Sequence, residues 1–269
     1  MTELDLEKIT GIASKHVKEV GEFIRHESTR FKNSSVELKG FNDLVSYVDK
    51  TAEIKLVDGL KDLIPNAGFL LEEKTSKTLA DSEFQWIIDP LDGTTNFVHG
   101  VPCYSISVAL AENKNIIAGI IYEINLDEMF TAWKDGGSFL NGKPIQVSSA
   151  NKLSESLIAT GFPYIDFSFM SKYMEVFNYC MKNTRGLRRL GSAAVDLAYV
   201  ACGRFDVFYE YGLNPWDVAA GTIIVKEAGG KVTDFNNGLE YIFGNEILAS
   251  NNKVHNEFLD VTKKAFGYS

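Results

Sequence analysis

Short apolar runs separated by turn residues dominate the chain between residues 68 and 133. Each run is too short for an ordinary helix and is rich in residues that favour strands. Because few helical segments interrupt the runs, they predict a mostly antiparallel sheet, with turns at Gly136–Gly137 and Asn141–Gly142. The runs are GFLLEE (68–73), QWIIDP (85–90), YSISVAL (104–110), IIAGIIYEI (116–124) and EMFTAW (128–133).

Helical periodicity precedes this sheet. From Leu6 to about Ile24, apolar residues recur at steps of three and four, which is the spacing of one helix face. A second periodic stretch runs from about Val48 to Ile64, where the sequence PNAG (65–68) predicts its end. The first half, about residues 1–150, is therefore predicted to contain helices followed by an antiparallel sheet.

The second half, about residues 151–269, alternates strands with helices. Its best-marked helix begins after Asn214, a favourable N-cap, has Pro215 at its first position and ends at Gly229–Gly230. No repeat or flexible linker separates the halves, so we expect a single domain over residues 1–269 with a site between its halves. The other predicted strands are SLIAT (156–160), RFDVFYE (204–210), KVTD (231–234) and EILAS (246–250), and the other predicted helices are at about 170–180, at about 193–201 and at the C-terminus.

Composition limits the classes of partner. With 269 residues, 45% of them apolar, the chain is long enough to bury a large core. Its 27 Lys and Arg residues against 36 Asp and Glu residues give a net charge of −9. This balance does not suggest direct nucleic-acid binding, which needs a basic face, and an anionic substrate would need local positive charge.

Cysteine usage and the N-terminus bear on location. Cys103, Cys180 and Cys202 form no Cys-x-x-Cys pair and leave an odd number, which fits reduced thiols better than a disulfide framework. The start MTELDLEKIT lacks the apolar core of a signal peptide, and no apolar run approaches the roughly 20 residues that cross a bilayer. We therefore expect a cytoplasmic protein without membrane contact.

The segment WIIDPLDGTTNF (86–97) places two aspartates at the end of an apolar run. Asp89 ends the run before a proline, and Asp92 follows at the Gly93 turn. Two threonines come next, where hydroxyl and backbone N–H groups would reach an anion. The alternative is an Asp-rich turn whose side chains cap their own backbone.

Further acids stand beside other predicted elements. The pair Glu72–Glu73 ends an apolar run, although such a pair is usually solvated surface. Asp217 falls in the first turn of the helix after Asn214, where the helix dipole favours a carboxylate and where it would also complete a cap. Taken alone, neither position requires a function.

Taken together, these carboxylates suit hard cations. Mg²⁺ prefers oxygen ligands and is held in proteins by few carboxylates. Two ions about 3.5–4 Å apart would offset the repulsion among the acids, attract a phosphate monoester and assist both attack by water and departure of the leaving oxygen. Zinc is disfavoured, because His16, His26, His99 and His255 show no metal-ligand spacing.

The sequence resembles the inositol monophosphatase family, within the wider group of lithium-sensitive, magnesium-dependent phosphatases. WIIDPLDGTTNF is similar to the first signature of the family, and NPWDVAAGTIIVKEAGG (214–230) is similar to the second. The resemblance covers about residues 6–250 and implies a layered α/β/α/β/α fold of the α+β type and a homodimer. Three further segments follow the family's order: DLVSYVD (43–49), LLEE (70–73) and RRLGSAAVDLAYVACGRFDVFYE (188–210).

The resemblance also implies residue roles. Asp89 would bridge two of two or three Mg²⁺ ions, and Asp43 would support a more weakly held one. Thr94 and Asp49 would orient the attacking water and form the catalytic group together with Glu72. The implied metal ligands are Glu72, Asp89, Asp92, Asp217, Asp43 and the carbonyl of Leu91, and the implied substrate-binding residues are Asp92, Gly93, Thr94, Gly191, Ser192, Ala193 and Glu210.

Structural explanations stay open for several of these residues. Asp43 and Asp49 would also suit the start of a helix, Gly191–Ser192 a helix cap, and Glu210 a solvated strand end. One position departs from the family: Leu71 stands where many members have glycine before the glutamate pair. Because leucine cannot supply a glycine-only conformation, the loop around Glu72 is expected to differ.

The leading hypothesis is hydrolysis of inositol monophosphate, and Glu210 favours a polyol. The alternatives within the same chemistry are phosphatases of fructose 1,6-bisphosphate, histidinol phosphate or adenosine 3′,5′-bisphosphate, because the metals act on the phosphate and the pocket reads the rest of the substrate. A hypothesis of another class is a regulatory partner of the transcription or RNA machinery, a side role attributed to some bacterial relatives.

Overall fold

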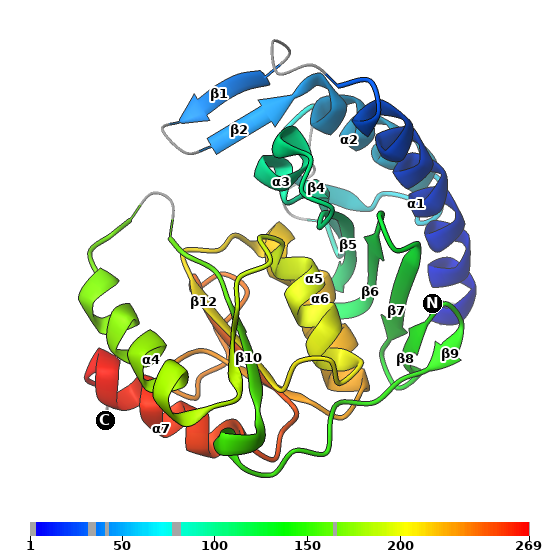
Figure 1. The fold of residues 1–269 in the computed structure, drawn as a ribbon. Coiled ribbons are helices and arrows are strands. Elements are labelled where there is room, and N and C mark those ends of the chain that lie inside the picture. Colours follow the sequence, from blue (N-terminus) through cyan, green and yellow to red (C-terminus); the bar gives the residue numbers. More distant parts are fainter. Residues whose placement is uncertain (1–3, 32–35, 41–42, 77–81, 164–165, 269) are drawn as a thin grey trace.

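The computed structural model describes residues 4–31, 36–40, 43–76, 82–163 and 166–268, with the backbone alone described for 36–40 and 43–45. Within these residues, two large sheets alternate with pairs of helices (Figure 1). The order through the molecule is a first helix pair, α1 (Leu6–Ser28) and α2 (Tyr47–Leu60), a seven-stranded sheet, a second pair, α5 (Ala193–Ala201) and α6 (Pro215–Glu227), a five-stranded sheet, and a third pair, α4 (Met170–Asn183) and α7 (His255–Phe266). The expected α/β/α/β/α fold is therefore confirmed.

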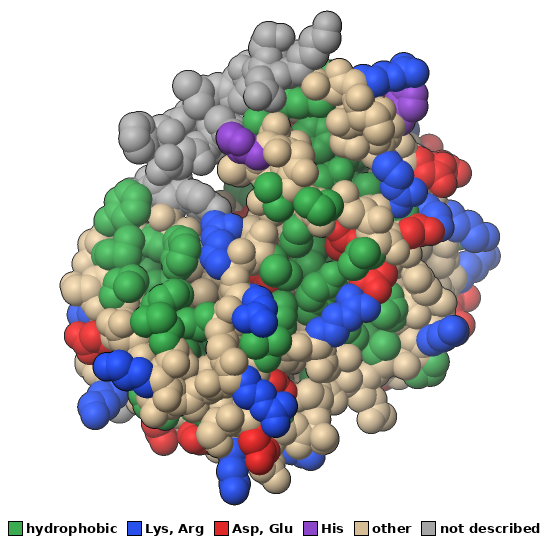
Figure 2. Space-filling view, in the orientation of Figure 1, with side chains coloured by type: hydrophobic (Ala, Val, Ile, Leu, Met, Phe, Trp, Pro, Cys, Tyr) green, Lys and Arg blue, Asp and Glu red, His purple; other side chains and the backbone are tan. Residues whose placement is uncertain are grey.

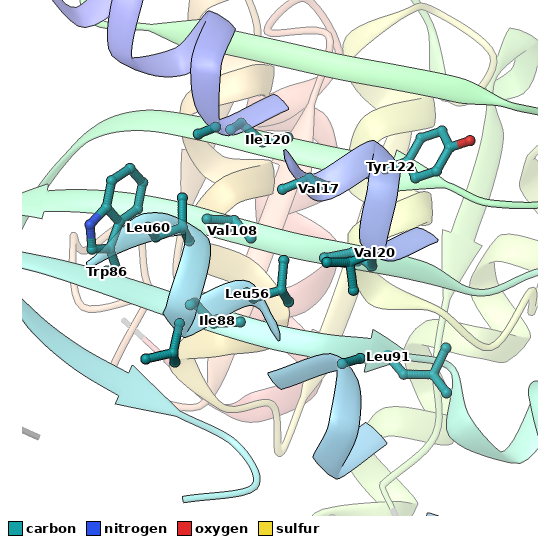
Figure 3. Close-up of a cluster of buried hydrophobic side chains, with 14 of the residues drawn as sticks. Val17, Val20, Leu56, Leu60, Trp86, Ile88, Leu91, Val108, Ile120 and Tyr122 are labelled. Carbon is teal, nitrogen blue, oxygen red and sulfur yellow. The ribbon is translucent and has the colours of Figure 1, made fainter. Parts of the chain in front are cut away.

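Helices α1 (Leu6–Ser28) and α2 (Tyr47–Leu60) cover the outer face of the seven-stranded sheet. Helix α2 ends before Ile64, where the sequence predicted its end, because residues 61–66 form turns. Ile64 is nevertheless buried, which explains why the apolar spacing continues to this residue. It precedes Pro65, however, and a residue before proline disfavours the helical conformation. Figure 3 shows how the two helices pack on the sheet, with Val17, Val20, Leu56 and Leu60 next to Trp86, Ile88, Val108, Ile120 and Tyr122.

The seven-stranded sheet is mostly antiparallel, as predicted. Only β3 and β4 pair in parallel, and the other neighbours are antiparallel in the order β3-β4-β5-β6-β7-β8-β9. The Asn141–Gly142 turn between β8 and β9 uses positive φ angles of 49° and 74°. The strands are β3 (Gly68–Leu71), β4 (Phe84–Asp92), β5 (Ser105–Glu112), β6 (Asn115–Glu123), β7 (Glu128–Trp133), β8 (Gly137–Leu140) and β9 (Lys143–Pro144).

Helices α5 (Ala193–Ala201) and α6 (Pro215–Glu227) lie between the two sheets. Both begin where the sequence predicted. Helix α6 lies directly on β6, because a Cβ atom at Gly119 would be only 2.6 Å from the Ala220 carbonyl oxygen. A glycine is therefore required at this crossing.

The five-stranded sheet is mixed and has the order β11-β10-β12-β14-β13. Strand β10 is parallel to β11 and β12, whereas β14 is antiparallel to β12 and β13. Helices α4 and α7 cover the outer face, and α4 continues past the predicted Cys180. The elements are the 3-10 helix η2 (Leu153–Glu155), β10 (Leu157–Thr160), α4 (Met170–Asn183), β11 (Gly186–Arg188), β12 (Val207–Tyr211), β13 (Lys231–Thr233), β14 (Glu246–Ser250) and α7 (His255–Phe266).

Several elements were not predicted: the hairpin of β1 (Val36–Gly40) and β2 (Asp43–Ser46), the short helix α3 (Thr94–His99), the 3-10 helix η2 and strand β11. No helix in the described part of the chain is both long and apolar enough to span a membrane.

Some large apolar side chains are exposed near α4, among them Met174 and Met181, and Figure 2 shows green side chains gathered over that helix.

Candidate metal site and pocket

Three aspartates converge where the two halves of the chain meet. One carboxylate oxygen from each of Asp89, Asp92 and Asp217 lies within 4.8 Å of the others. Asp89 and Asp92 end β4, where pairing with β5 shifts register between them, and Asp217 lies in the first turn of α6. The structure thus brings together the acids that the sequence singled out from two distant segments.

The electrostatics of this cluster favour a cation. Burial raises the pKa of Asp89, and the carboxylates of Glu72, Asp92 and Asp217 raise it further. Burial is also the main cause that raises the pKa values of Asp92 and Asp217. A divalent cation relieves repulsion of this kind, and carboxylate oxygens are ligands that hard cations prefer. The donor set therefore fits Mg²⁺.

Glu72 lies immediately after β3 and lines the same pocket as Asp92 and Asp217. Its carboxylate raises the pKa of Asp89, although Glu72 is not one of the three groups within 4.8 Å of one another. The expected difference of the Glu72 loop from glycine-containing relatives stays a prediction. Leu71 is buried in β3, opposite Ile88, and is not among the residues with positive φ. No glycine-specific conformation is needed there.

The loop after Glu72 is anchored by Glu53 of α2, a residue that sequence reasoning missed. Glu53 is fully buried. Its Oε2 accepts a hydrogen bond from the backbone N–H of Glu73 at 2.7 Å, and its Oε1 accepts from Thr75. The available signal was an acid on the otherwise apolar face of a helix.

Asp49 caps α2 and contacts Thr94 at the same time. Its Oδ2 accepts from the backbone N–H of Ser46 at 2.9 Å and from the Ser46 hydroxyl at 2.6 Å, which caps α2. Its Oδ1 lies 2.9 Å from the Thr94 hydroxyl, which is also 3.0 Å from the Leu91 carbonyl oxygen. Burial raises the pKa of Asp49. Asp43 begins β2, but its side chain lies outside the described residues.

Asp92 is held from the second half of the chain. Its Oδ2 accepts from the Ser192 hydroxyl at 2.6 Å and from the backbone N–H of Ala194 at 2.7 Å. The Ser192 side chain also caps α5, as the structural explanation proposed, by accepting from the N–H of Val195. Its hydroxyl proton is thus directed at Asp92.

A pocket of about 840 Å³ extends from the acidic cluster. Glu210 lines it and is only 4% exposed, so the explanation of Glu210 as a solvated strand end is wrong. A Cβ atom at Gly161 would lie 2.0 Å from Glu210 Oε1, so this glycine makes room for the carboxyl. Burial raises the pKa of Glu210, and the Arg189 guanidinium opposes that shift. Gly93, Thr94, Gly191, Ser192 and Ala193, all expected to bind substrate, also line the pocket.

Comparison with known proteins agrees with this geometry. Residues 5–264 match the sequence model of the inositol monophosphatase family. The inositol-1-monophosphatase of Mesorhizobium japonicum is 39% identical over 244 residues, which are 91% of this chain and 92% of that protein. The Nus factor SuhB of Escherichia coli is 40% identical over 216 residues, or 80% and 81% of the two chains. The extragenic suppressor protein SuhB of Bartonella henselae has a crystal structure with a TM-score of 0.89 at 37% identity, covering 96% of this chain and 99% of that one.

Proposed function

Because the chain belongs to the inositol monophosphatase family, we propose that it hydrolyses phosphate monoesters of small polyols, inositol monophosphate in particular, with Mg²⁺ as cofactor. The observation that carries this proposal is the cluster of Asp89, Asp92 and Asp217, of which Asp92 and Asp217 line a pocket whose wall includes the buried Glu210. The cluster suits a phosphate with its cations, and Glu210 suits hydroxyl groups.

Glu72, Asp89, Asp92 and Asp217, with the Leu91 carbonyl, would hold two or three Mg²⁺ ions, and Asp43 would support the weakest. Bound Mg²⁺ would offer positive charge to the phosphate oxygens and lower the pKa of an attacking water. This charge is needed because the chain carries a net charge of −9. Asp92 would be kept in place by its bonds from Ser192 and Ala194.

Thr94 and Asp49 would orient the water. The Thr94 hydroxyl donates a hydrogen bond to Asp49, so that its lone pairs stay available to accept a hydrogen bond from the water. The N–H groups of Gly93 and Thr94 would donate to phosphate oxygens, because the first N–H groups of a helix have no partner within it. Gly93 has φ 97°, and a Cβ there would lie 3.1 Å from the Cys103 carbonyl oxygen, so only glycine suits this turn.

In the wall of the same pocket, Glu210 would accept hydrogen bonds from substrate hydroxyls, and the backbone of Gly191, Ser192 and Ala193 would contact the substrate. This reading favours inositol phosphate over the other esters of the same chemistry, since two of the alternatives, fructose 1,6-bisphosphate and adenosine 3′,5′-bisphosphate, carry a second phosphate. That phosphate would meet a buried acid.

A panel of phosphate esters assayed with Mg²⁺, with and without lithium, tests the proposal. The panel contains inositol 1-phosphate, fructose 1,6-bisphosphate, histidinol phosphate, adenosine 3′,5′-bisphosphate and an aryl phosphate. We expect the highest kcat/KM for inositol 1-phosphate. A higher value for one of the other natural esters would reassign the substrate, and no hydrolysis of any ester would reject the phosphatase.

A second candidate function is a regulatory partnership with the transcription machinery. It rests on the likeness to a relative that is itself called a Nus factor. An Asp89→Asn variant would separate the two functions, because it alters the acidic cluster inside the pocket and not the outer surface. Transcription complexes would be isolated from cells that express the wild-type chain. If these complexes do not contain the chain, the second function is rejected.

We also propose a homodimer in the cytoplasm, as the family resemblance implies. The three cysteines are free thiols in the structure, in agreement with a reducing compartment. Light scattering on the purified protein would test the dimer, and a monomeric mass at micromolar concentration would reject it.

A further inference from the structure

Asp196 is the only charged residue within α5 and has no role in the mechanism described so far. It is 1% exposed, and its Oδ1 is buried without a hydrogen-bond partner among the described residues. Most buried polar atoms in proteins are paired, and an unpaired one costs stability. Because Asp196 also lines the pocket, its incompletely paired carboxyl points to a ligand that completes it.

Asp196 lines the same pocket as Glu210 and Arg189. Burial raises the pKa of Asp196, the nearby Glu210 carboxyl raises it further, and the Arg189 guanidinium opposes both effects. Arg189 lies over the Phe162 ring, with its Cζ atom 5.6 Å from the ring centroid. The Arg189 guanidinium thus acts on both of these buried acids in the pocket wall, Asp196 and Glu210.

We infer that Asp196 is a second hydroxyl-binding residue, which accepts a hydrogen bond from one hydroxyl of the leaving group while Glu210 accepts from another. This inference rests on the proposed phosphatase function. It narrows the substrate class to monophosphates of uncharged polyols that carry several hydroxyl groups besides the ester oxygen. A leaving group with a single hydroxyl would leave one of the two acids unpaired.

The test compares Asp196→Ala with Asp196→Asn. Alanine is the best helix former and adds no volume, so α5 should keep its conformation. For each protein, kcat/KM is measured with Mg²⁺ for inositol 1-phosphate and for p-nitrophenyl phosphate, which has no hydroxyl to bind. We expect the ratio of the two values to fall about tenfold in Asp196→Ala, the scale of one hydrogen bond. Asp196→Asn, which retains a hydrogen-bonding side chain, should restore most of the ratio.

Thermal unfolding supplies an independent readout. Because Asp196→Ala removes an unpaired buried acid, we expect its Tm to rise by about 2–4 °C. Asp206→Ala is the matched control. Asp206 is also a buried acid, but its carboxylate accepts hydrogen bonds from the Ser148 hydroxyl and from the N–H of Leu157. Its loss should lower Tm.

The outcomes are distinct. An unchanged substrate ratio in an active Asp196→Ala protein would overturn the inference and leave the proposed function intact. Equal losses on both substrates together with a lower Tm would show that Asp196 supports the fold, which also overturns it. A wild-type protein that hydrolyses neither ester would reject the proposed function, and the inference with it.

Discussion

Glu53 Oε1 lies 2.8 Å from both the backbone nitrogen and the hydroxyl oxygen of Thr75, and accepts a hydrogen bond from each. Together with the bond from Glu73, this contact ties the loop that carries Glu72 to helix α2. Glu53 does not line the pocket, so it acts on the site through the position of Glu72.

We expect Glu53→Ala to weaken the response to Mg²⁺ as well as the fold. Three donors lose their acceptor, which costs about 1–3 kcal/mol of unfolding free energy for each donor that stays buried. The Mg²⁺ concentration for half-maximal activity should rise about tenfold. This is the lower end of the loss in metal affinity that follows when a residue that orients a metal ligand is removed. Activity is measured across a Mg²⁺ titration.

Glu227→Ala is the control for Glu53→Ala. Glu227 accepts hydrogen bonds from the backbone N–H groups of Asp135 and Gly137, so it also anchors a turn. It does not line the pocket. Its loss should lower Tm without shifting the Mg²⁺ titration. If the two variants shift the titration equally, Glu53 has no special effect on the site.

Asp89→Asn should lower turnover by orders of magnitude while the fold stays intact. Asp89 is the buried acid on which the charges of Glu72, Asp92 and Asp217 converge, so its charge is needed to hold cations there. In EDTA the same variant should have a higher Tm than the wild type, because one repelling charge has gone. An unchanged rate would leave the capping explanation of this segment standing.

Removal of Mg²⁺ should abolish hydrolysis, and its return should restore it. We also expect millimolar lithium to inhibit, in line with the family that the chain belongs to. Mg²⁺ should raise the Tm of the wild type by binding the folded state alone, and should raise that of Asp89→Asn less. Full phosphatase activity in EDTA would refute the metal mechanism.

Glu210→Gln should lower kcat/KM for inositol monophosphate by about 1.5–3 kcal/mol, the range for a hydrogen bond to a charged group. The loss for an aryl phosphate should be smaller. Gly161→Ala perturbs the same carboxyl without changing Glu210 itself, since the added methyl group would collide with the Glu210 carboxyl and displace it. Equal losses on both substrates would mean that Glu210 supports the fold or the metals instead.

His255 should make the folded state less stable in mild acid. It is fully buried between the hydroxyls of Thr233 and Ser250, and burial lowers its pKa from 6.5 to about 4. Between these two values the unfolded chain binds a proton that the folded chain does not, so stability falls as pH falls. The wild type should lose about 2 kcal/mol more than His255→Gln between pH 7 and pH 5 in urea unfolding. Parallel pH profiles would contradict this.

Local signals predicted much of the fold because they coincide with the packing. Helix α6 begins at Pro215 as expected, since Asn214 and Pro215 act within one turn. Helix α3 was missed because a helix of six residues after a glycine has too little periodicity to detect.

The acids show why part of the site escaped prediction. For Asp49 and Asp217, a cap and a site role were treated as alternatives, but a carboxylate has two oxygens. In Asp217 one oxygen accepts from the N–H of Asn214 while the group also belongs to the cluster. Asp196, Arg189 and Glu53 gain their significance from contacts between distant segments, which no local pattern encodes, although an aspartate inside the apolar segment AAVDLAYVA was a visible signal.

The acidic cluster is assembled from both halves: β4 contributes Asp89 and Asp92, whereas α6 contributes Asp217. During synthesis, a ribosome that has released only the seven-stranded sheet has exposed a chain that still lacks Asp217. We therefore expect a nascent chain to acquire its cation site late, after α6 has docked on β6. If the two halves were expressed as separate fragments that meet at the α5–α6 layer, they would regain that site only by reassociating. Cation binding would therefore measure the association of the two fragments.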